Sequence, residues 1–150
     1  MPTGSGAPRI AVLLGVLAVA ACGSSGSDAP STVAVRLSGA TVQAEIATDA
    51  NARERGLSGR RSLADGRGML FVYRDHVART YWMKGMRFPI DIIWIDRGKV
   101  TGVERNVPVP EGGVPLYRSD GPVDRVLEVG AGWAARNEIR AGDPVVIREG

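Results

Sequence analysis

Apolar and polar residues alternate along two early segments of the chain, residues 32–37 (TVAVRL) and 41–47 (TVQAEIA). A period of two is typical of strands with one buried face and one solvated face. The connection between the two segments is short, residues 38–40 (SGA), and this favours a hairpin. The folded part is therefore predicted to begin with two antiparallel strands.

Two segments have a helical pattern instead. Thr48 or Asp49 can cap a helix over residues 50–55, which are mostly good helix formers, and Gly56 is a natural stop. Residues 131–139 (AGWAARNEI) predict a second short helix with its Trp on the packed face. Both helices are too short to form a helical layer of their own.

Apolar runs bounded by turn residues predict further strands over residues 69–73, 79–84, 91–96, 99–107, 125–130 and 144–148. Residues 108–122 hold four Pro and three Gly, so they are expected to form a long loop without a strand interior. Strands outnumber helices and most connections are of hairpin length. The predicted fold class is α+β, with a mainly antiparallel sheet, curled or barrel-like, and one or two short helices plugging an end.

The segments 79–84 and 91–96 belong to the apolar stretch YWMKGMRFPIDIIWID, and we expect them to form a hairpin. A simple register gives the pairs Lys84–Asp91, Met83–Ile92, Trp82–Ile93 and Tyr81–Trp94. Both faces of such a hairpin are apolar, so the strands are predicted to be covered on both sides. The aromatic pair would stabilise it across the strands.

The N-terminal segment predicts export. Residues 1–21 combine a charged start, a short apolar run and small residues, as in a secretory signal, and 12 apolar residues are too few to span a bilayer. Residues 19–22 (VAAC) resemble a lipobox, which implies acylation of Cys22. Residues 22–32 are then the lipidated Cys and a Gly/Ser-rich tether, and residues 33–150 form one globular domain.

Composition narrows the function classes. The net charge is +3, but the 17 Arg and 2 Lys are interleaved with Asp and Glu, which indicates a mixed solvated surface and no nucleic-acid partner. His76 is the only histidine and Cys22 the only cysteine. A metal site built from His and Cys is therefore excluded, and neither a metal nor a cofactor is expected.

Five short motifs occur in order between residues 54 and 143: Glu54-Arg55-Gly56-Leu57, Gly68-Met69-Leu70-Phe71, Trp82-Met83-Lys84 with Pro89-Ile90-Asp91, Val126-Leu127-Glu128, and Ile139-Arg140-Ala141-Gly142-Asp143. In this order they resemble the bacterial and archaeal family called domain of unknown function 192. The resemblance implies a mostly β domain that is often exported or lipid-anchored, and it implies no established reaction. One departure is Ser58, where members of that family often have Met.

Two carboxylates are candidates for chemistry. Asp91 is either a perturbed carboxylate, with Lys84 as its partner or as an anion contact, or a structural acceptor. As a structural acceptor it would bind backbone N–H groups of the turn near Pro89 or the Lys84 ammonium. Glu128 shares a strand face with Val126, and it points either to solvent or into a polar cavity. If the two converged in one cleft, they could act as an acid–base pair or as hard oxygen ligands.

Basic residues are candidates for ligand binding. Arg55 and Arg60 flank a Gly-containing turn that could hold a carboxylate or phosphate group, and Lys84 could join them. The alternative is that the arginines are surface residues paired with Glu54 or Asp65. The spacing matches no phosphate-loop pattern.

Together these features favour a lipid-anchored domain on the extracytoplasmic face of a bacterial membrane, acting as a binding or accessory module without catalysis. Its partner would be an envelope protein or a small anionic ligand, contacted around the basic residues, Asp91 and the loop 108–122. One alternative is an envelope hydrolase using Asp91 and Glu128, which requires their carboxyl groups within about 10 Å. The other is a purely structural lipoprotein.

Overall fold

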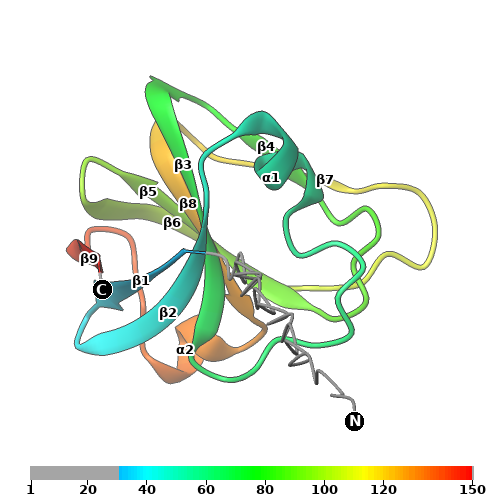
Figure 1. Ribbon diagram of the computed structural model, residues 1–150, viewed down its shortest axis with the longest axis horizontal. Coiled ribbons are helices and arrows are strands. Elements are labelled where there is room, and N and C mark those ends of the chain that lie inside the picture. The colour runs from blue at the N-terminus through cyan, green and yellow to red at the C-terminus, as the bar shows by residue number, and fades with distance from the viewer. Residues whose placement is uncertain (1–30, 150) are drawn as a thin grey trace, which may run out of the picture.

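A computed structural model describes residues 31–149 of the chain, which fold around a curled seven-stranded sheet with the strand order β6-β5-β8-β3-β2-β1-β9 (Figure 1). A separate two-stranded sheet pairs β4 with β7. The elements are β1 (Thr32–Leu37), β2 (Ala40–Ala47), α1 (Ala50–Arg55), β3 (Arg67–Val77), β4 (Thr80–Trp82), β5 (Ile90–Asp96), β6 (Lys99–Val107), β7 (Leu116–Arg118), β8 (Val123–Gly130), α2 (Trp133–Arg136) and β9 (Val145–Glu149). The β-rich curled sheet with two short helices confirms the predicted architecture.

The first hairpin and the first helix form where the sequence pattern places them. Strands β1 and β2 pair antiparallel from Thr32 opposite Glu45 to Leu37 opposite Ala40. Helix α1 is capped by Asp49, whose side chain accepts a hydrogen bond from the Ala52 amide at 2.9 Å. Short-range turn and cap chemistry is sufficient to specify both elements.

The sheet is mixed: most of its strand pairs are antiparallel, as predicted, but one pair is parallel, which the sequence pattern did not predict. Strands β2 and β3 run parallel, and helix α1 lies on the crossover between them (Figure 1). A parallel pair needs such a crossover, because a tight turn reverses the chain direction. The other pairs of this sheet, β1–β2, β1–β9, β3–β8, β5–β8 and β5–β6, are antiparallel.

Both faces of the central strands are covered, as the apolar pattern of residues 91–96 predicts. One core contains Ile93, Leu127 and Trp133 and packs under α2, while the other contains Phe71, Ile92 and Trp94 and packs under the segments around α1 and β4. Alternate residues of β5 therefore enter different cores. Two apolar layers on one sheet bury much of the chain's hydrophobic surface.

The predicted hairpin of residues 79–84 and 91–96 is wrong. Strand β4 pairs with β7, whereas β5 pairs with β6 and β8, so Lys84 and Asp91 are not cross-strand neighbours. Tyr81 and Trp94 still touch edge-to-face, with ring centroids 5.5 Å apart. The partner strand β7 lies inside the Pro/Gly-rich segment 108–122, which was expected to contain no strand.

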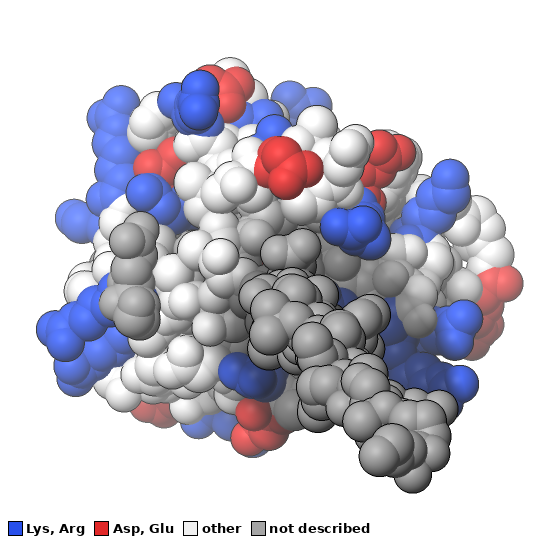
Figure 2. Space-filling view, viewed as in Figure 1, with Lys and Arg blue, Asp and Glu red and all other residues white. Residues whose placement is uncertain are grey.

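The described residues include no helix long and apolar enough to cross a membrane. The predicted signal segment 1–21 and the predicted lipidation site Cys22 lie outside the described residues. On the face shown in Figure 2, basic and acidic side chains are interspersed rather than gathered by sign.

Candidate functional site

Asp91 is fully buried, and its carboxylate links three backbone amides from β6 and the start of α2. Its carboxylate accepts hydrogen bonds from the amides of Asn106 at 2.8 Å, Gly132 at 3.1 Å and Ala134 at 2.8 Å. Gly132 and Ala134 lie at the N-terminal end of α2, which has no side-chain cap of its own. Asp91 thus supplies from a distant strand the acceptor that a helix start requires. It is a structural acceptor, although its donors are not those of the turn near Pro89.

Asp91 and Glu128 lie on opposite faces of the sheet. Asp91 is directly opposite Val129 in the β5–β8 pair, and Ile92 is opposite Glu128. Because directly opposed residues share a face and neighbours along a strand alternate, Asp91 belongs to the face under α2 and Glu128 to the other. The two carboxyl groups do not share a cleft, and the paired-carboxylate arrangement is wrong.

Glu128 instead borders a cavity of about 290 Å³ on the face that carries α1 and β4. Its side chain comes from the middle of the central strand β8 and is only 5% exposed. No other described residue hydrogen-bonds its carboxyl group. Burial raises the pKa of Glu128 to about 8, because water no longer solvates the charged form. At neutral pH this carboxyl group is therefore mainly protonated and can both donate and accept a hydrogen bond.

Aromatic side chains form the walls of the cavity. Phe71 and Tyr81 meet edge-to-face at 5.2 Å between centroids, and the hydroxyl groups of Tyr81 and Tyr73 lie 2.7 Å apart. Trp82 also lines the cavity and is 48% exposed. A half-exposed indole beside a buried polar group is typical of a surface that stacks on a ligand.

Basic side chains stand at the rim of the cavity. Arg55 and Lys84 both line it, both are exposed, and neither forms an ion pair with another of the described residues. The Lys84 ammonium lies 5.7 Å from the centroid of the Trp82 ring. Glu54 is the exposed acidic residue that lines the same cavity. The rim can therefore attract an anionic group.

The loop that follows α1, the helix that ends at Arg55, is tied to the turn that carries Lys84. The Gly59 amide donates a hydrogen bond to the Gly85 carbonyl at 2.9 Å. A Cβ atom at Gly85 would lie 2.2 Å from the Ser58 Oγ, and Gly85 has a φ of +73°. Only glycine fits this contact without displacement. The loop contact fixes the distance between the Arg55 and Lys84 sides of the cavity.

Arg60, the third basic candidate, does not line the cavity. Its guanidinium makes two hydrogen bonds of 2.6 Å with the Glu45 carboxylate, and this bond is the main cause of the lowered pKa of Glu45. The expected partners were Glu54 or Asp65. Glu45 lies on β2, and only the folded crossover brings it to the loop after α1.

The structure brings three of the candidate residues named from the sequence, Arg55, Lys84 and Glu128, to this cavity, whereas its aromatic walls were not predicted. Phe71 comes from β3, and Tyr81 and Trp82 come from the next strand, β4. The sequence pattern of both segments indicated core residues. The contact surface expected at loop 108–122 does not line this cavity.

Comparison with known proteins gives a family and a fold. The model of the domain of unknown function 192 family (DUF192, an uncharacterized ACR) matches residues 33–147. A solved structure from Sinorhizobium meliloti 1021, of a protein titled as a candidate transcription regulator, is 33% identical with a TM-score of 0.70, covering 79% of this chain and 95% of that one. A protein of unknown function from Novosphingobium aromaticivorans is 32% identical with a TM-score of 0.69, covering 77% of this chain and 83% of that one. Among curated proteins, none matches.

Proposed function

The chain belongs to the DUF192 family, and we propose that it is a binding module that takes one small anionic molecule in the Glu128 cavity. The supporting observation is the convergence of a buried carboxyl group, aromatic walls and unpaired rim cations on one hollow. A cavity near the lower end of the about 300–1,000 Å³ range of ligand sites suits a molecule the size of a monosaccharide or an amino acid. A protein partner would need a much larger surface.

Each part of the cavity has a chemical role in this proposal. Arg55 and Lys84 pair with the anionic group of the ligand, and the Trp82 ring stacks on its body. The neutral carboxyl group of Glu128 exchanges hydrogen bonds with a hydroxyl or amide group at the deep end of the ligand. A buried carboxyl group without a protein partner would gain the most from such a contact.

We further propose that the module works on the extracytoplasmic face of a bacterial membrane, attached through acylated Cys22. The support is the VAAC sequence after an apolar run and the Gly/Ser-rich segment before β1. Metabolic labelling with a palmitate analogue should mark the wild-type chain, and Cys22→Ser should abolish the label. Labelling that persists in the variant would contradict attachment of the lipid at Cys22.

Binding can be tested by calorimetry with a panel of sugar acids, monosaccharide phosphates and amino acids. For any member that binds, Arg55→Ala combined with Lys84→Ala should weaken affinity at least about tenfold, because two charge-assisted contacts are lost. Arg140→Ala is the matched control, since this arginine is 74% exposed and lies outside the cavity. Absence of binding across the panel, or affinity equal in the double variant and the wild type, would favour the purely structural alternative.

A further inference from the structure

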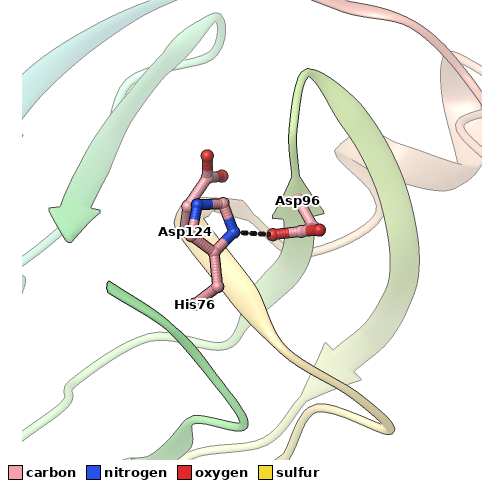
Figure 3. Close-up of side chains that lie close together, drawn as sticks. All are labelled: His76, Asp96 and Asp124. Atoms are coloured by element: carbon pink, nitrogen blue, oxygen red, sulfur yellow. Dashed lines mark hydrogen bonds and ion pairs between the residues drawn. The ribbon is translucent and has the colours of Figure 1, made fainter. Parts of the chain in front are cut away.

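Three side chains of metal-ligating type meet at one end of the central strands, away from the Glu128 cavity. They are His76 on β3, Asp124 on β8 and Asp96 on β5 (Figure 3). Val77 is opposite Val123, and Ile95 is opposite Arg125. His76 and Asp96 therefore flank Asp124 on its two sides, in one row across three adjacent strands. One ligand atom from each residue lies within 4.8 Å of the other two.

Asp124 is the central member, and its bonding is incomplete. The residue is 9% exposed, and its Oδ2 accepts a hydrogen bond from Arg125 at 2.7 Å. Its Oδ1 is buried and has no hydrogen-bond partner among the described residues. A buried carboxylate oxygen without a partner is costly, and a second carboxylate, that of Asp96, stands beside it in the row. A cation bound between them would be a partner for the Asp124 Oδ1 and would offset the repulsion between the two carboxylates.

The imidazole of His76 defines the geometry of such a site. Its Nδ1 lies 2.7 Å from the Asp96 Oδ1, so a proton joins the two atoms (Figure 3). Ligand atoms around a tetrahedral zinc ion lie roughly 3.4 Å apart, given bonds of about 2.1 Å. A metal that replaces the proton would thus require shifts of about an ångström in these side chains.

The outer oxygens of both carboxylates face arginines. Arg125 binds the Asp124 Oδ2, and the Arg97 Nε lies 3.9 Å from the Asp96 Oδ2. Groups that hold the second oxygen of a carboxylate orient the first oxygen toward a metal. Arg97 is 79% exposed, so solvent screens its repulsion of a bound cation.

We propose that His76, Asp96 and Asp124 bind a divalent transition-metal ion of the zinc type. One imidazole nitrogen and two carboxylate oxygens suit zinc, whereas calcium and magnesium prefer oxygen ligands alone. Three protein ligands leave a coordination position for water or another small ligand. The bound ion would also link the ends of β3, β5 and β8. This site needs no cysteine, so the argument against a His/Cys site does not apply to it.

The test is a calorimetric titration of the full chain with Zn²⁺, without a polyhistidine tag. Cys22→Ser is present throughout, so that no thiol competes for the metal. We expect one zinc ion per chain, and an affinity at least about tenfold lower in His76→Gln and in Asp124→Asn. Asp120→Asn is the matched control, because Asp120 is exposed and lies outside the row.

A second measurement is independent of any substitution. His76 is the only histidine, so the single pair of imidazole ¹⁵N resonances reports on it directly. Saturating Zn²⁺ should shift one of these resonances strongly. Unchanged imidazole resonances, no zinc binding, or binding that survives both His76→Gln and Asp124→Asn would overturn the proposal.

Discussion

Replacing Glu128 by Gln should make the protein more stable at neutral pH. Glutamine has nearly the size and shape of glutamic acid, but it stays neutral at every pH. In the unfolded chain the pKa of Glu128 is near its ordinary value of 4.5, whereas in the folded chain burial raises the pKa of Glu128 to about 8. Between these values folding must bind a proton, so the wild type loses stability as the pH rises from 4.5 to 8.

The size of the effect follows from the two pKa values. Each pH unit between 4.5 and 7 contributes about 1.36 kcal/mol, so at pH 7 the wild type loses about 3 kcal/mol relative to Glu128→Gln. At pH 8 and above the difference approaches about 5 kcal/mol, and at pH 4 it is close to zero. A typical domain has a free energy of unfolding of about 5–15 kcal/mol, so the effect is large enough to measure.

Urea unfolding at a series of pH values measures this difference. The free energy of unfolding of the wild type is subtracted from that of the variant at each pH, so that the other titrating groups cancel. Glu111→Gln, at an exposed position outside the cavity, is the matched control and should follow the wild type at every pH. A difference for Glu128→Gln that does not change between pH 4.5 and 8, or a variant less stable than the wild type at pH 7, would refute the burial argument.

Three other substitutions test Asp91, on one face of the sheet, and the cavity on the other face. Asp91→Asn should lower the free energy of unfolding by about 2–3 kcal/mol, because the amide side chain keeps only one acceptor oxygen for the three backbone donors. A loss below about 0.5 kcal/mol in urea unfolding would contradict the role of Asp91 as a structural acceptor. Gly85→Ala should cost more stability than Gly59→Ala. The two glycines have φ values of +73° and +77°, but an added Cβ atom would collide with the Ser58 side chain at Gly85 and would meet open space at Gly59; equal losses in urea unfolding would mean that the positive φ alone causes the destabilisation. Trp82→Ala should change the free energy of unfolding by less than about 1 kcal/mol, because the side chain is half-exposed. Calorimetry should nevertheless show weaker ligand binding, and an unchanged affinity would mean that the indole does not contact the ligand.

Elements with local causes could be predicted from the sequence. The first hairpin, the Asp49 cap and the two-sided burial of β5 follow from turn residues and the period of apolar positions. The pairing of β4 with β7 could not be predicted in this way, because residues more than 30 positions apart are brought together by the whole fold. A nearby apolar strand was the simpler partner for β4, and it was the wrong one.

Three residues that line the cavity were named from the sequence, but their arrangement could not be predicted. Strand alternation correctly placed Glu128 on the same face of the sheet as Val126. Whether that face met solvent or a cavity depended on the packing of α1 and β4 above it, which the sequence pattern does not give. A structural acceptor was one of the two roles predicted for Asp91, but its donors lie 15 to 43 positions away and could not be identified from the sequence. The row of His76, Asp96 and Asp124 depends on the register of three strands, and no local pattern in the sequence encodes that register.

Chemical-shift mapping tests the proposed ligand site most directly. The chain is labelled with ¹⁵N and with ¹³C in its carboxyl groups, and it is titrated with the anionic molecule from the panel that binds most tightly. We predict that the largest changes occur at the Glu128 carboxyl carbon, the Trp82 indole and the Arg55 and Lys84 amides. Changes that gather on another surface, with the Glu128 carboxyl resonance unmoved at saturation, would contradict a binding site in this cavity.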